Sequence, residues 1–401
     1  MKKKDMFIIF AILALVSLSD GLLYNFQELW MVDNLFSVKT ISVIYSLCSL
    51  LTVSVIFLCS NIIKKEKLKT FVAILLLIKI ICIVFLYLLY KTGMMFLIKF
   101  FIIIDYVIDI EIYTTIYPMM SIVDKNDKAY AKKDIVYNSF YYFGVLLTSF
   151  LLGKTIFIFK INYNSYLYLA LIFAILSFVM TLVLNLNKYL KKASKKKNNQ
   201  KLIIESLYND IKHDKISNFY FLATVANQIS YNTIFGTIIL FLTTGLNMSA
   251  KSASNIYMML GIMAVVFGAI ALAKLTFKND YINIGIKLIG RLIFYIIAFV
   301  SGVPFLAFAA LAYAKITSVS YSHITEAPYI NRIDKDYQLA FCNFKEMIVY
   351  LGKSVGIYLC GFLIAISWRF NFLTAAIFVL IEVLLRFKAV KLYKQEQGET
   401  K

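Results

Sequence analysis

The sequence predicts an all-α integral membrane protein with twelve transmembrane helices arranged as two six-helix repeats. Hydrophobic residues make up 61% of the 401 residues, and the mean hydropathy is +0.77. A soluble domain is only about 45–50% apolar, so this composition favours a membrane protein. The chain has 3 prolines and 15 glycines, which leaves few residues for loops.

Long apolar segments account for the expected helices. A helix needs about 20 apolar residues to cross the hydrocarbon core of a bilayer. A closed β-barrel is the only other structure that spans a bilayer, and the alternating strands of a barrel are not the pattern here. The expected spans are 6–30, 40–63, 70–90, 94–121, 135–158, 164–187, 218–244, 249–273, 281–301, 303–330, 337–366 and 370–391.

Lysine and arginine predict the orientation of these helices, because cytoplasmic loops carry an excess of both residues. With the N-terminus in the cytoplasm, most basic residues fall on the inner side, above all in 188–215. The outer loops then hold only Lys39, Lys91, Lys160, Lys251 and Arg369. We therefore expect both termini in the cytoplasm of a cell with the chain in its plasma membrane. This bias also explains the net charge of +20 without nucleic-acid binding.

The basic stretch divides the chain into three parts. Residues 1–187 form an N-terminal six-helix bundle, 188–217 a cytoplasmic linker, and 218–401 a C-terminal six-helix bundle with a cytoplasmic tail. Leu202, Leu207 and other apolar residues of the linker recur at near-helical spacing. This favours an amphipathic helix that binds anionic lipids on the inner membrane face, and a solvated linker remains the alternative.

The two bundles resemble each other in sequence. Residues 37–45 read SVKTISVIY and residues 249–257 read SAKSASNIY. Further along, Pro118 corresponds to Pro328, and Gly144 corresponds to Gly352. Two repeats of six helices each enter the membrane in the same orientation, so an axis along the membrane normal relates them. Gly144 and Gly352 are expected to permit close helix packing.

This layout resembles the major facilitator superfamily of secondary transporters. The resemblance rests on the 6+6 helices, the parallel repeat, the basic central loop and the chain length. The family signature after the second helix, G-x-x-x-D-R-x-G-R-R, is reduced here to SNIIKKEKLK at 60–69, which keeps only its basic character. The resemblance implies alternating access, in which two bundles rock around a central site lined by helices 1, 4, 7 and 10.

Polar residues inside the expected spans gather on those same four helices. An ionisable side chain at the middle of a bilayer costs at least about 2.5–3.5 kcal/mol, so it rarely faces lipid. Helix 1 carries Asp20, and helix 4 carries Asp105, Asp109 and Glu111. We therefore expect a polar cavity. The candidate solute-binding residues of helices 7 and 10 are Gln228, Tyr231, Asn232, Lys315, His323 and Glu326.

Helical geometry places the acids of helix 4 on two different faces. Asp105 and Asp109 lie on one face, because residues four apart are neighbours on a helix, whereas Glu111 points away, with Lys79 as one possible partner. Two close, poorly solvated carboxylates favour a bound proton. We therefore take Asp20, Asp105 and Asp109 as candidates for proton coupling. The alternative is a packing network in which the acids neutralise Lys79, Lys99 or Lys315.

Together these patterns favour a secondary active transporter that moves a small organic solute by alternating access, coupled to protons. A multidrug proton antiporter is the alternative, because 34 phenylalanines and 28 tyrosines could line an apolar pocket. A membrane-embedded enzyme or a non-transporting receptor is a remote alternative. The chain has 2 histidines, 5 cysteines without metal-ligand spacing and no catalytic motif. We expect no enzyme activity, no cofactor, no metal and a monomer.

Overall fold

The computed structural model describes most of the chain. The described residues are 2–33, 36–62, 67–123, 136–137, 139–145, 147, 155–156, 159–160, 163–186, 211–274, 280–330 and 338–396. Most of the basic linker therefore lies outside the described residues, including Leu202 and Leu207.

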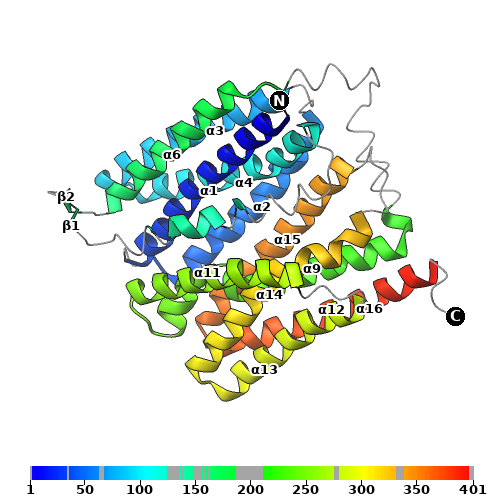
Figure 1. The fold of residues 1–401 in the computed structure, drawn as a ribbon. Helices are drawn as coiled ribbons and strands as arrows, with labels where there is room; N and C mark the ends of the chain where they lie inside the picture. Colours follow the sequence, from blue (N-terminus) through cyan, green and yellow to red (C-terminus); the bar gives the residue numbers. More distant parts are fainter. Residues whose placement is uncertain are drawn as a thin grey trace. The chain divides into compact units, whose positions relative to one another are not determined.

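Nearly all described residues of the first half are helical (Figure 1). The described elements are α1 (Lys2–Asp33), α2 (Val38–Ile62), α3 (Leu68–Thr92), α4 (Met95–Val123), β1 (Thr155–Ile156), β2 (Phe159–Lys160) and α6 (Tyr163–Val183). Residues 136–137 and 139–145 are also helical. The fifth expected span, 135–158, is too long at its end, because Thr155 and Ile156 pair with Lys160 and Phe159 in a short antiparallel hairpin.

The second half contains one expected span that is bent, 218–244, whereas the span 281–301 is continuous and includes a π-helical turn. Its elements are α9 (Lys215–Phe235), α10 (Ile238–Leu240), a π-helical turn (Phe241–Gly245), α11 (Ala250–Lys274), α12 (Asp280–Ile284), a second π-helical turn (Gly285–Ile289), α13 (Gly290–Ser301), α14 (Pro304–Ile330), α15 (Gln338–Ile364) and α16 (Trp368–Glu396). The chain bends by 47° between α9 and the segment 238–245. Gly236 lies at this bend, where α15 approaches so closely that a Cβ would lie 2.5 Å from Ile357 Cγ1.

The start of α9 follows from local sequence. The Asp214 carboxylate accepts hydrogen bonds from the backbone N–H groups of Ile216, at 3.1 Å, and Ser217, at 3.3 Å. An aspartate at this position satisfies donors that have no partner within the helix. The helix therefore begins at Lys215, slightly before the expected start at 218.

The chain divides into two compact units, and two helices are split between them. One unit comprises Met1–Leu35, Ser54–Lys197 and Ala250–Met258, and the other comprises Phe36–Val53, Asn198–Ser249 and Met259–Lys401. From the sequence we expected two bundles separated by a linker, with boundaries at 187 and 218. These boundaries follow the order of the helices along the chain, and they stay a prediction.

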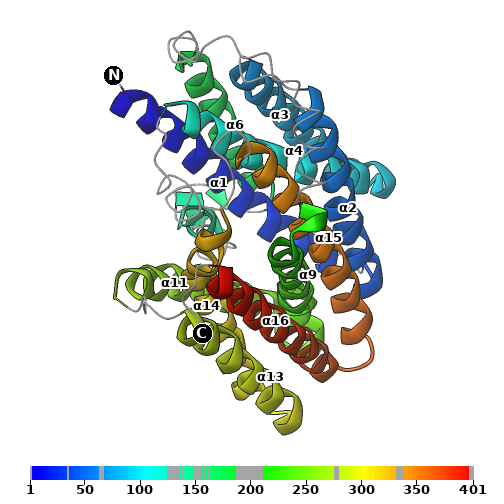
Figure 2. The same cartoon turned by 90° about the vertical axis from the view of Figure 1, so that its right-hand side faces the viewer.

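The two units repeat the same pattern of helix packing. In the first, α1 packs against α4 and α6, and α3 packs against the same two helices (Figures 1 and 2). In the second, α9 contacts α14 and α16, and so does α13. Since α9, α13, α14 and α16 follow in the order of α1, α3, α4 and α6, this pattern agrees with the sequence repeat.

The helices present apolar side chains outward and bury polar ones. On α3, Ile74, Leu77 and Leu88 are exposed, whereas Lys79 is fully buried. Six described helices are long and apolar enough to cross a membrane, and the bent pair at 215–245 would be a seventh. An apolar exterior over buried charges is the arrangement that lipid requires. The chain is a multi-pass membrane protein, and the count of twelve helices stays a prediction.

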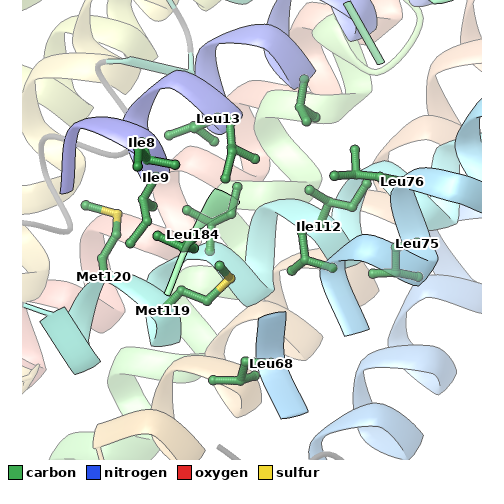
Figure 3. Close-up of a cluster of buried hydrophobic side chains, with 14 of the residues drawn as sticks. Ile8, Ile9, Leu13, Leu68, Leu75, Leu76, Ile112, Met119, Met120 and Leu184 are labelled. Atoms are coloured by element: carbon green, nitrogen blue, oxygen red, sulfur yellow. The ribbon is translucent and has the colours of Figure 1, made fainter. Parts of the chain in front are cut away.

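An apolar core fills the inside of the first unit (Figure 3). It combines aliphatic and methionine side chains of α1, α3 and α4, including Ile9, Leu76, Ile112 and Met119, none of which is exposed. Leu76 and Ile112 are each three residues from a buried charged side chain, Lys79 and Asp109 respectively. The core therefore adjoins the charged residues and excludes water from one side of them.

Candidate functional site

Lys79 is the centre of a buried charged cluster in the first unit. It lies on the inner face of α3 with Val72, Leu76, Cys82 and Leu86, which are all at most 1% exposed. Their spacing of three or four residues places them on one stripe of the helix. The sequence of α3 therefore directs this ammonium group toward α1 and α4 instead of lipid.

Three aspartates surround the Lys79 ammonium. Lys79 Nζ lies 3.0 Å from Asp20 Oδ1 of α1. On α4, it lies 2.5 Å from Asp109 Oδ1 and 3.6 Å from Asp105 Oδ1. All four side chains are at most 2% exposed. The structure thus brings together all three aspartates that the sequence singled out.

Neutral donors complete the cluster. On α1, the Tyr24 hydroxyl donates to Asp109 Oδ2 at 3.2 Å, and Gln27 Nε2 donates to Asp105 Oδ2 at 3.4 Å. Tyr24 and Gln27 are one helical turn apart, so they share the face of α1 that also carries Asp20. The hydroxyl of Tyr137 donates to Asp20 Oδ2 at 3.3 Å.

The cluster has more acids than bases. Three carboxylates meet one ammonium, so full ionisation would leave two surplus negative charges in a buried site. Uncompensated buried charge is strongly unfavourable, and the affected groups bind protons instead. Neutralisation of Lys79, the packing alternative, accounts for only one of the three aspartates. Proton binding by two of the aspartates would remove the surplus charge.

Glu111 lies apart from this cluster. Its side chain is 3% exposed, and its Oε1 atom has no hydrogen-bond partner among the described residues. The pairing with Lys79 that the sequence allowed is wrong, since Lys79 contacts Asp20, Asp105 and Asp109 instead. A helical wheel places Glu111 correctly away from Asp105 and Asp109, but it cannot say which face of α4 meets α3.

In the second unit, Tyr231 of α9 meets α14, whereas Gln228 and Asn232 lie beside glycines of α15. Lys315 Nζ donates to the Tyr231 hydroxyl at 2.7 Å, and lies over the Tyr231 and Phe235 rings at 5.3 and 5.1 Å from their centroids. Asn232 Nδ2 donates within α9 to the Gln228 side-chain oxygen at 3.1 Å.

The other two candidates of the second unit cannot be placed at the site. His323 and Glu326 lie on the helical backbone of α14, but their side chains are outside the part that the structure describes.

Another buried cation, Arg291, was not among the candidate site residues from the sequence. It lies on the inner face of α13 with Tyr295 and Ala298, and it is fully buried. Its guanidinium donates to Asn227 Oδ1 at 3.0 Å and to Thr317 Oγ1 at 3.3 Å. An arginine in the middle of an apolar span is itself a signal of a functional site, and it could have identified this residue.

The chain has no detectable sequence relative in two comparisons: no family model matches it, and neither does any curated protein.

Solved structures nevertheless match nearly the whole chain. The human organic anion transporter MFSD10 (TETRAN) is 11% identical, with a TM-score of 0.67, over 96% of this chain and 99% of that chain. The nucleoside transporter NupG is 13% identical, with a TM-score of 0.67, over 97% and 99%. The major facilitator superfamily proton:xylose symporter XylE, bound to 6-bromo-6-deoxy-D-glucose, is 13% identical, with a TM-score of 0.64, over 97% and 96%.

The chain has the major facilitator superfamily fold. At these identities the likeness concerns the fold alone. In this fold the acid cluster belongs to the first half of the repeat, on α1, α3 and α4, and Arg291 and Lys315 belong to the second half, on α13 and α14.

Proposed function

We propose that the chain is a secondary active transporter that moves a small organic solute across the plasma membrane by alternating access, with protons as the coupling ion. One observation carries this proposal: three buried aspartates share a single lysine. The similar structures support it, because they include an organic anion transporter, a nucleoside transporter and a proton:xylose symporter.

The surplus acids explain how a proton gradient could drive transport. In a closed, dry cluster, Asp20, Asp105 and Asp109 hold protons because one ammonium cannot balance three charges. When movement of one bundle relative to the other admits water, the carboxylates become solvated and release protons. The proton affinity therefore differs between the two states, so proton binding and conformation are coupled.

The same proposal assigns the orientation and the partners. Both termini and the basic linker 188–217 face the cytoplasm, where the linker binds anionic lipids. The protein is a monomer that binds its solute and protons.

Uptake into proteoliposomes tests the proposal. A thermal-shift screen against metabolites and drugs first selects a solute that stabilises the purified protein. We then expect an imposed pH gradient to drive accumulation of that solute by the wild type. Asp105→Asn should abolish gradient-driven accumulation and retain exchange of solute across the membrane, because the substitution removes a proton site and keeps the fold.

Glu111→Gln provides the matched control. It changes a buried acid of the same helix that does not contact Lys79, so gradient-driven accumulation should stay at the wild-type level. Accumulation by Asp105→Asn equal to that of the wild type would show that the cluster does not couple protons to transport.

A further inference from the structure

No acid among the described residues balances the buried charge of Arg291. The side chain is 0% exposed, and its described hydrogen bonds go only to neutral oxygens of Asn227, Thr317 and Ala314. Among the described residues, no carboxylate lies within ion-pair distance of the guanidinium. Arginine stays protonated in proteins, and a buried charge without a counter-charge is strongly destabilising.

A second cation meets the same face of α9. Arg291 contacts Asn227, and Lys315 contacts Tyr231 one helical turn later. Residues four apart lie on one side of a helix, so the two cations are directed at one surface. The atoms of α14 that accept from Arg291, the Ala314 carbonyl and the Thr317 hydroxyl, flank Lys315 in sequence.

The first unit shows what balances a cation at this place in the repeat. There the third helix supplies Lys79, and the first and fourth helices supply three carboxylates. In the second unit the third helix of the repeat supplies Arg291, but the first and fourth supply an amide, a hydroxyl and a second cation. The same arrangement of helices therefore surrounds its cation with carboxylates in one unit and, among the described residues, with neutral groups and a second cation in the other.

We propose that Arg291 and Lys315 bind an oxyanion of the transported solute, a carboxylate or phosphate group, at the face of α9 formed by Asn227 and Tyr231. Asn227 and Tyr231 are only half-buried and Lys315 is 9% exposed, so the groups that contact the two cations are not fully enclosed. Guanidinium can bind both oxygens of a carboxylate or phosphate, which would supply the missing counter-charge. The inference rests on the proposed transport function and adds that the solute is an organic anion.

Binding by the purified full-length protein tests the anion site without any gradient. The probes are benzoate, succinate and glycerol phosphate, each compared with its neutral analogue: benzamide, succinamide and glycerol. We expect at least one acid to raise the melting temperature and its neutral analogue to leave it unchanged. The carboxylate and phosphate arms distinguish the two kinds of oxyanion. An equal response to acids and neutral analogues, or no response to any acid, would overturn the inference.

Variants then locate the site. Arg291→Gln should weaken binding of the stabilising acid about tenfold or more, and Arg291→Lys less, because lysine keeps the charge but not the planar fork. Without solute, Arg291→Gln should melt no lower than the wild type, since it removes an unbalanced charge. A merely structural arginine would instead lower the melting temperature and leave acid binding intact in the folded fraction, which would overturn the inference.

Arg369→Gln is the matched control. This arginine of the same unit also donates to neutral oxygens, the Phe299 and Val300 carbonyls, but it does not contact α9. Its loss should leave acid binding unchanged. Acid binding without solute accumulation in proteoliposomes would contradict the transport proposal alone, and accumulation of a neutral solute without any acid binding would contradict the anion site alone.

Discussion

Lys79 is the residue on which the acid cluster depends. It is the only cation that contacts Asp20, Asp105 and Asp109 among the described residues. The aspartates were predictable from the sequence, because acids in apolar spans must face the protein interior. Their shared partner was not, since the choice among Lys79, Lys99 and Lys315 depends on how α1, α3 and α4 pack.

Removal of Lys79 should destabilise the protein in a pH-dependent way. Lys79→Gln leaves three buried carboxylates without a cation, and breaking a buried ion pair costs about 3–5 kcal/mol. Low pH protonates the carboxylates and removes the surplus charge, so the loss of melting temperature should be smaller at acidic than at alkaline pH. Thermal melts of the purified variant across pH measure this difference.

The double variant is the control for this prediction. Asp109 is the closest partner of Lys79, so adding Asp109→Asn to Lys79→Gln should recover part of the stability if the two groups interact directly. Two outcomes would contradict this account of the cluster together: a loss of melting temperature that does not depend on pH, and a loss in the double variant equal to the sum of the two single losses.

At the scale of the elements, glycines let helices approach each other in both halves. A Cβ on Gly144 would lie 2.7 Å from the Leu18 carbonyl oxygen of α1. A Cβ on Gly352 of α15 would lie 2.8 Å from Gln228 Cβ of α9. The sequence predicted this close packing from matching positions in the repeat.

The bend in the span 218–244 and the π-helical turn in the span 281–301 were not predictable in the same way. Both segments were expected as single straight spans, and neither contains a proline. Their π-helical turns, Phe241–Gly245 and Gly285–Ile289, depend on hydrogen bonding and packing that hydropathy does not report. The hairpin at 155–160 was missed because its strands are only two residues long.

Crowding the contact between α9 and α15 should destabilise the second unit. A Cβ on Gly356 would lie 2.8 Å from both the Ile229 carbonyl oxygen and Asn232 Cβ. Overpacking of this kind typically costs about 1–3 kcal/mol. Gly356→Val should therefore lower the melting temperature, and it should also weaken solute binding because it displaces α9.

Gly285→Ala is the control for this substitution. The nearest atom to a Cβ at Gly285 is Ile289 Cδ1 at 3.9 Å, an ordinary contact, so its melting temperature should stay close to that of the wild type. Equal melting temperatures for Gly356→Val and Gly285→Ala would show that the close approach of α15 to α9 is not required.

For the whole molecule, the distribution of charge predicts the orientation in the membrane. Lys212 and Lys251 are both exposed and are expected on opposite sides. In intact cells, an impermeant thiol reagent should label Lys251→Cys from outside, and it should label Lys212→Cys only after permeabilisation. The half-buried Cys59 is first changed to serine, as is Cys342, so that only the new cysteine reacts. Labelling of Lys212→Cys in intact cells would overturn the orientation.

The most direct measurement of the central claim follows protons while solute moves. Wild-type proteoliposomes containing a pH-sensitive dye receive a gradient of the stabilising solute and no pH gradient. Because coupling is reciprocal, we predict that solute movement changes the internal pH in the wild type. In Asp105→Asn the solute should still exchange without a pH change. Solute movement by the wild type with no change in internal pH would contradict proton coupling through the Lys79 cluster.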